Sequence, residues 1–247
     1  MTRKRSEVQI LQRPLRDQTS RGLTGEGELI MKGIARVLSA GTICAALLVS
    51  MPAAAQAAKK ATICTDVLQP GTYHKVIVPQ DAVCLSDGPV TIRGGLFVDP
   101  GATFVLGSED NPVDTGTISG GVHATNPANL QIHFTTINGG IESHGGSGPF
   151  GGPFDITWNA IEDNVIHGSV TIDGYDGFWF GFIRNDSRGS VNLNDNVLED
   201  PDGNEYVTNT IHGNLNCTGD SPAPQIGDSG GEPNVVTGQK TGQCEEV

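Results

Sequence analysis

Positive charge is scarce in this chain. Its 247 residues include 15 lysines and arginines against 28 aspartates and glutamates, which gives a formal net charge of −13. Residues 58–247 contain 7 of these cations and 24 of these acids, so this part alone has a net charge of −17. A surface of this sign repels nucleic acid and anionic lipid, which argues against both as partners. It suits divalent cations or cationic partners, and it also keeps an exported protein soluble.

The chain also lacks an apolar run suited to a permanent membrane helix, which needs about 20 strongly apolar residues. Residues 31–57 read MKGIARVLSAGTICAALLVSMPAAAQA, a basic start followed by a short alanine-rich stretch and small residues. This order is typical of a secretory signal peptide with cleavage after Ala57. We therefore expect a secreted, extracellular protein that is not embedded in a membrane. Residues 1–30 are polar and basic, and we interpret them as a translated upstream region, with Met31 as the true start.

Cysteine is sparse, and four of the five cysteines remain once the predicted signal peptide is set aside. These four are Cys64, Cys84, Cys217 and Cys244. An even number in an exported chain predicts two disulfide bonds, because exported proteins fold in an oxidising compartment. The histidines then have no cysteine partners for a zinc site, and their spacing does not suit one.

A hexamer recurs through the middle of the chain. It reads TIRGGL at 91, TISGGV at 117, TINGGI at 136, VIHGSV at 165 and TIHGNL at 210, with a weaker SRGSV at 187. Its first glycines are 19 to 29 residues apart, an irregular period that suits the coils of a parallel β-helix. The glycine is expected at a corner, where the backbone takes a positive φ or bends too tightly for a Cβ atom.

Alternation within each copy predicts which side chains face the core, because successive side chains of a strand point to opposite sides. The expected inward residues are Ile92, Leu96, Val98, Ile118, Val122, Ala124, Ile137, Ile141, Ser143, Ile166, Val170, Ile172, Ile211, Leu215 and Cys217. Asparagine recurs two residues before an aliphatic residue, at Asn159, Asn164, Asn196 and Asn209. Asparagine tolerates turn conformations, and stacked asparagines can hydrogen-bond from coil to coil.

With these corner glycines and asparagines, residues 73–217 resemble the coils of right-handed parallel β-helix proteins. The sequence from Asn209 to Cys244 is similar to the C-termini of secreted bacterial β-helix repeat proteins that have no established activity. The resemblance implies an all-β solenoid without helices. Residues 58–90 would form the N-terminal cap and first coil, residues 91–217 the coils, and residues 218–247 a Gly/Pro-rich C-terminal cap. A β-sandwich is the alternative, but it gives no reason for the hexamer to recur.

The solenoid geometry selects one of the three possible disulfide pairings. Cys84 precedes the first complete hexamer and Cys217 closes the last, with five coil steps between them. At about 4.8 Å a step, the two ends lie on the order of 24 Å apart. Bonded cysteines have Cα atoms within about 7 Å of each other. We therefore predict that Cys64 pairs with Cys84 and that Cys217 pairs with Cys244, each bond closing one cap.

Many right-handed β-helix proteins are pectate lyases or polygalacturonases, and these activities require particular catalytic residues. Lyases of this fold use calcium with a basic residue, and hydrolases use clustered carboxylates. After the signal peptide there are three arginines, Arg93, Arg184 and Arg188, and none lies in a run similar to those enzymes' motifs. The positions before the corner glycine should align in one outward row, either a binding strip or a solvated edge. They are Arg93, Ser119, Asn138, His167, Arg188 and His212.

Aromatic residues are few, yet eight of the 13 lie between residues 150 and 182. Three phenylalanines of GFWFGFIRND share one face and are expected in the core: Phe178, Phe180 and Phe182. We name Trp158, Tyr175 and Trp179 as candidates for stacking on sugar rings. A satellite core beneath the glycine-rich loop is the other interpretation of this region.

A dense acidic stretch follows, and Asp200, Asp202 and Glu205 are its candidate calcium ligands. The stretch lacks the full spacing of a calcium loop, and an ordinary surface turn explains it equally well. We expect no cofactor other than possible calcium at these residues.

Two functions are compatible with these observations. The first is a secreted, non-catalytic β-helix with a structural or adhesive role at an extracellular surface. The alternative is a polysaccharide-active enzyme or a carbohydrate-binding module, for which a glycan would be the ligand. The scarcity of cations and the missing enzyme motifs favour the first.

The signal peptide gives the first testable prediction. The exported protein should begin at Ala58, because small residues at 55 and 57 satisfy the signal peptidase. N-terminal sequencing of protein from the culture medium checks this, and a secreted chain that begins before Met31 would contradict it.

Overall fold

The computed structural model describes residues 60–108, 112, 115–148, 158–227 and 230–247. Within these residues the chain forms 26 β-strands and a single short 3-10 helix. A compact unit spans Ala58–Val247. No helix in the described part of the chain is long and apolar enough to cross a membrane.

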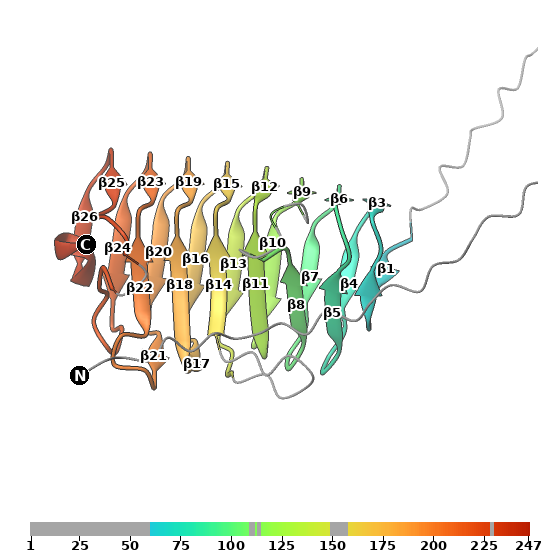
Figure 1. Cartoon of the computed structure of the whole chain (residues 1–247), viewed down its shortest axis with the longest axis horizontal. Helices are drawn as coiled ribbons and strands as arrows, with labels where there is room; N and C mark the ends of the chain where they lie inside the picture. Colours follow the sequence, from blue (N-terminus) through green and yellow to red (C-terminus); the bar gives the residue numbers. More distant parts are fainter. Residues whose placement is uncertain (1–59, 109–111, 113–114, 149–157, 228–229) are drawn as a thin grey trace, which may run out of the picture. The chain divides into compact units, whose positions relative to one another are not determined.

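Three parallel sheets run along a stack of coils (Figure 1). Each coil passes through sheets 1, 2 and 3 in turn, except that after β24 (Leu215–Thr218) the chain reaches sheet 3 without another strand of sheet 2. Sheet 1 contains β1 (Thr62–Ile63), β4 (Val76–Val78), β7 (Leu96–Val98), β10 (Val122–Thr125), β13 (Ile141–His144), β16 (Val170–Asp173), β20 (Val191–Asn194), β24 (Leu215–Thr218) and β26 (Lys240–Gly242). Sheet 2 contains β2 (Val67–Leu68), β5 (Val83–Ser86), β8 (Thr103–Leu106), β11 (Asn129–His133), β14 (Trp158–Glu162), β18 (Trp179–Ile183) and β22 (Asn204–Val207). Sheet 3 contains β3 (Gly71–Tyr73), β6 (Val90–Ile92), β9 (Gly116–Ile118), β12 (Thr135–Ile137), β15 (Val165–Ile166), β19 (Asp186–Ser187), β23 (Thr210–Ile211) and β25 (Val235–Val236).

This topology is a parallel β-helix, which confirms the predicted fold class and excludes the sandwich. A separate pair of short strands, β17 (Asp176–Gly177) and β21 (Val197–Leu198), lies between sheets 1 and 2 along the chain. Every inward residue predicted from the hexamer is buried, with an exposed fraction of 3% or less. The core therefore consists largely of aliphatic side chains stacked coil upon coil, with buried aromatic rings such as Phe104 and Tyr206 among them.

The recurring glycine is explained by close approach between the backbones of successive coils. A Cβ atom on Gly168 would lie 2.6 Å from backbone atoms of Gly139, and one on Gly213 would lie 2.5 Å from the Ser190 nitrogen. Positive φ occurs at the second glycine of two copies, Gly95 and Gly121. Contact between coils, more than backbone conformation, thus requires glycine at the first position.

Both predicted disulfides are confirmed. The Cα atoms of Cys64 and Cys84 are 5.5 Å apart, and those of Cys217 and Cys244 are 5.2 Å apart. Strands of the same sheets also precede residue 91 and follow residue 217, so both end segments contribute to the stack. The last strand leads into η1 (Gln243–Glu246), a short helix that the sequence did not predict.

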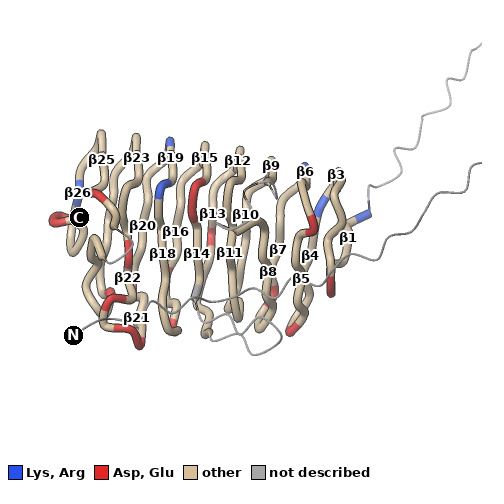
Figure 2. Tube along the Cα trace, viewed as in Figure 1, with Lys and Arg blue, Asp and Glu red and all other residues tan. Residues whose placement is uncertain are grey.

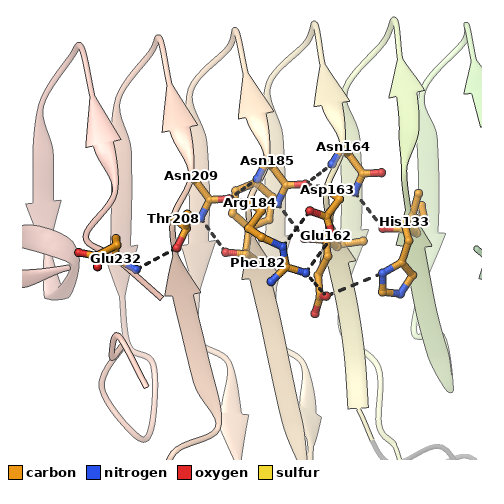
Figure 3. Close-up of polar contacts among 12 residues, drawn as sticks. His133, Glu162, Asp163, Asn164, Phe182, Arg184, Asn185, Thr208, Asn209 and Glu232 are labelled. Atoms are coloured by element: carbon orange, nitrogen blue, oxygen red, sulfur yellow. Dashed lines mark hydrogen bonds and ion pairs between the residues drawn. The ribbon is translucent and has the colours of Figure 1, made fainter. Parts of the chain in front are cut away.

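A ladder of buried asparagines fixes the corner between sheets 2 and 3 (Figure 3). It contains Asn164, Asn185, Asn209 and Asn234, each exposed by 4% or less. Each Oδ1 accepts the backbone N–H of the residue one coil earlier, at 2.8–3.1 Å. Each Nδ2 donates to a carbonyl of an earlier coil at 2.7–2.8 Å. The sequence prediction thus named two ladder members, Asn164 and Asn209. It did not name Asn234, although Asn234-Val-Val236 fits the same pattern, or Asn185, which does not fit it.

Asn209→Ala should destabilise the protein by about 2–6 kcal/mol. The substitution leaves the Asn185 N–H and the Phe182 carbonyl buried without their partners, at about 1–3 kcal/mol for each group. The midpoint of urea denaturation, followed by circular dichroism, measures the change. Asn138→Ala, at an exposed position of the neighbouring corner, is the matched control and should change stability by about 0.5 kcal/mol or less. Equal effects of the two substitutions would contradict the role assigned to the ladder.

Candidate functional site

The aromatic residues divide between core and surface differently from the sequence prediction. Phe180 and Phe182 are buried, but Phe178 is 41% exposed, so the expectation of a core position is wrong for Phe178. It precedes β18, so the alternation of that strand does not extend to it. Tyr175 is 1% exposed and packs edge-on against Phe180, with ring centroids 6.3 Å apart. Burial raises the pKa of the Tyr175 hydroxyl well above its ordinary value. Tyr175 is therefore a core residue and not an exposed platform for sugars.

The two tryptophans occupy matching positions on adjacent strands. Trp158 begins β14 and pairs in register with Trp179, which begins β18. The side chain of Trp179 is half-buried, beside the exposed Phe178. The side chain of Trp158 lies outside the described residues, as do Phe150 and Phe154. Two of the three predicted aromatic candidates are thus neighbours in the sheet.

The acidic residues proposed for calcium do not gather into one site. Asp200 Oδ1 accepts the Asp202 N–H at 3.1 Å within their own turn. Glu205 lies on β22 and is 1% exposed. Over the described ranges of the chain, no group of three or more His, Cys, Asp or Glu side chains could hold a metal ion. Calcium binding at these three residues stays an untested prediction.

A charged cluster at the outer side of the ladder corner was not anticipated from the sequence (Figure 3). Arg184 donates to both oxygens of Asp163 at 2.8 Å and to Glu162 Oε2 at 3.2 Å. His133 faces the same Glu162 oxygen at 3.8 Å. These residues come from three successive coils, so the cluster ties β11, β14 and β18 together. The one sequence signal was a charged residue directly before each of Asn164 and Asn185, where the backbone takes positive φ at Asp163 and Arg184.

Asp220 ends a second, shorter ladder. Asn196 Oδ1 accepts the Tyr175 N–H at 3.1 Å, and Asp220 Oδ1 accepts the Asn196 N–H at 2.9 Å. Asp220 thus takes the place that an asparagine fills one coil earlier. It is 5% exposed, and its Oδ2 has no hydrogen-bond partner among the described residues. Burial disfavours the charged form and raises the pKa of Asp220 to about 7.

The most regular exposed feature is a line of side chains where sheet 3 turns toward sheet 1, here called the corner row. It contains His74, Arg93, Ser119, Asn138, His167, Arg188, His212 and Thr237, all exposed. From Arg93 onward, each backbone N–H in the row donates to a carbonyl of the preceding coil at 2.8–3.0 Å. The structure therefore aligns the six positions predicted from the hexamer and adds one at each end.

A second line runs beside the corner row on the outer face of sheet 3. Its register-paired members are Thr72, Thr91, Thr117, Thr136, Val165, Asp186, Thr210 and Val235. Near the N-terminal end of the two lines, a hollow of about 230 Å³ is lined by Thr72, Tyr73, His74 and Arg93. The two lines and this hollow form the sheet 3 face, the candidate binding site.

Comparisons with protein-family models, with curated proteins and with solved structures find no match to this chain. The site is therefore interpreted from its own geometry. It offers hydroxyl, imidazole, amide and guanidinium groups at fixed spacing on rigid strands, which suits binding to an extended partner.

The buried carboxyl of Asp220 gives a prediction for pH dependence. The folded protein keeps this proton up to about pH 7, whereas the unfolded chain releases it near 3.8. Because the folded state binds more protons between these values, this group makes the free energy of unfolding fall as the pH rises through them. Asp220→Asn removes the titration and fits the ladder position. We expect the variant to gain stability relative to the unsubstituted protein as pH rises from about 4 to about 8.

Urea denaturation midpoints across this pH range measure the difference between the two proteins. Asp87→Asn, at an exposed position, is the control and should differ from the unsubstituted protein by an amount that barely depends on pH. An Asp220→Asn difference that is equally flat with pH would refute the raised pKa.

Proposed function

We propose that the chain is a secreted, non-catalytic β-helix protein that attaches to an extracellular surface through the sheet 3 face. The observation that carries this proposal is the corner row, in which eight successive coils each expose one side chain in register. A row of this length presents many weak contacts at once. Such contacts together give firm attachment even when each one alone is weak.

Rigidity supports a binding role for this face. The backbone of the corner row is hydrogen-bonded to the coil before it, and the corner glycines bring successive coils so close that no Cβ atom fits between them. Side chains on a fixed backbone lose little conformational freedom when a partner binds. The sheet 3 face is thus pre-organised, as an adhesive surface requires.

Export is supported by the order of residues in 31–57 and by the two disulfides. Disulfides persist in oxidising compartments outside the cytosol and are rare within it. Both bonds close end segments of the stack, where the core of a solenoid is open. A protein that works outside the cell benefits from such closed ends.

A carbohydrate-binding module is the second candidate function. The observation that favours it is the register pairing of Trp158 and Trp179 next to the exposed ring of Phe178. Exposed or half-buried rings such as those of Phe178 and Trp179 are suited to stacking on sugar rings. This candidate would use the outer side of sheet 2 in place of the sheet 3 face.

A retention assay on cells tests the proposed function. Labelled protein is incubated with intact cells of the producing organism, and the bound fraction and any released soluble sugar are measured. Ser119→Tyr with Asn138→Tyr places two bulky rings in the centre of the corner row, so we expect retention to fall by about tenfold. Thr171→Tyr with Asn192→Tyr, on paired strands of sheet 1, is the matched control and should retain binding.

Equal retention of both double variants would show that the sheet 3 face is not the attachment surface. Release of soluble sugar by the unsubstituted protein would overturn the non-catalytic assignment.

A further inference from the structure

We propose that the corner row binds a linear anionic polysaccharide, with a carboxylate or sulfate group seated in the hollow beside His74 and Arg93. This inference rests on the proposed attachment function and names the ligand class of that same face. Its first support is the placement of unneutralised positive charge in a protein that has little of it.

Several cations of the described chain are already engaged. Arg184 bonds to Glu162 and Asp163, and Lys75 lies over the Phe97 ring at 3.8 Å from its centroid. Arg93 and Arg188 are different, because their guanidinium groups have no carboxylate partner among the described residues and both are exposed. Both of these arginines lie in the corner row.

The corner row has no acidic member in any of its eight positions, although acids outnumber cations threefold in residues 58–247. Three of the six histidines of the chain also lie in it. Figure 2 shows cationic segments at the tips of β6 and β19, and acidic segments along the opposite edge near β5, β8, β17 and β21. Charges beyond about 8 Å are largely screened at physiological salt, so the distant acids do not prevent local binding of an anion.

The hollow supplies a defined place for the anionic group. It is lined by Thr72, Tyr73, His74 and Arg93, so a hydroxyl, an imidazole and a guanidinium belong to the residues around it. The planar fork of an arginine matches the two oxygens of a carboxylate or sulfate, and a hydroxyl can donate to a third oxygen. The Tyr73 hydroxyl already donates to the Gln69 carbonyl at 2.6 Å, which fixes that wall of the hollow.

The length and order of the row suit a chain rather than a single ion. From His74 to His212 there are six coil steps, or about 29 Å at about 4.8 Å a step. Cationic or imidazole groups lie at both ends of this span, and the neutral Ser119 and Asn138 lie between them. Neutral donors and acceptors suit the hydroxyl groups of sugars. Asp186 is the one acid in the neighbouring line, and it is bonded to His212 at 3.1 Å, so attraction is weaker at that end.

Binding of the exported protein, residues 58–247, to three immobilised polymers tests the inference: alginate, which carries carboxylates, dextran sulfate, which carries sulfates, and neutral dextran. We expect binding to one or both anionic polymers, weakened by added salt, and little binding to dextran. Arg93→Gln with Arg188→Gln should weaken it by about tenfold, because each lost contact is charge-assisted. Lys59→Gln with Lys60→Gln removes the same charge outside the row and is the matched control.

The two polymers separate the two anion types, since alginate alone indicates carboxylate and dextran sulfate alone indicates sulfate. Unchanged binding after Arg93→Gln with Arg188→Gln, equal loss in the lysine control, or equal binding to dextran would overturn the inference. Circular dichroism confirms that each variant is folded. If the arginine variant is still retained on cells while the tyrosine variant is not, the anionic ligand is refuted and the proposed attachment function is not. If the arginine variant and the tyrosine variant both keep full retention, the anionic ligand and the proposed attachment through the sheet 3 face are both refuted.

Discussion

Direct contact between the backbones of successive coils is the constraint on which the other features depend. At the turn from sheet 3 to sheet 1, Gly168 and Gly213 leave no space for a Cβ atom above the preceding coil. This contact keeps the strands in register and aligns the aliphatic side chains that fill the core. It also places every member of the corner row one coil step from the next. The stacking of the core and the alignment of the exposed corner row thus both follow from the spacing between successive coils.

Polar groups reinforce the same spacing at the corner between sheets 2 and 3. A buried amide is costly unless its donor and acceptor are both used. In the ladder, each asparagine meets both needs by bonding to the coils beside it, so its burial is favourable only within a stack (Figure 3). Outside the ladder, Arg184 links carboxylates of the preceding coil. The corner between sheets 2 and 3 is therefore held by hydrogen bonds between uncharged groups in the ladder and by the ion pairs of Arg184 outside it.

The sequence predicted those features that repeat and missed those that depend on irregular lengths. The hexamer and its alternation were sufficient for the core residues of sheets 1 and 3, for the disulfide pairing and for the corner row, but not for the core residues of sheet 2 such as Phe104 and Leu130. Asn185 escaped the asparagine pattern because Ser187 replaces the aliphatic residue that follows it. His133 and Glu162 are 29 residues apart, and only the observed register shows that they are neighbours. Tyr175 and Phe178 lie outside the long strands, where strict alternation no longer determines which side chain is buried.

The turn between sheets 3 and 1 has one more property: from β6 onward it always contains three residues between the strands, as from Ile92 to Leu96 and from Val236 to Lys240. All variation in coil length is taken up by the other connections. The side chains of the corner row therefore stay evenly spaced along the solenoid, whatever the lengths of the other loops. Duplication of a coil would add one side chain to the corner row and lengthen the row by one coil step. The sequences of the other loops can therefore diverge without changing the spacing of the corner row.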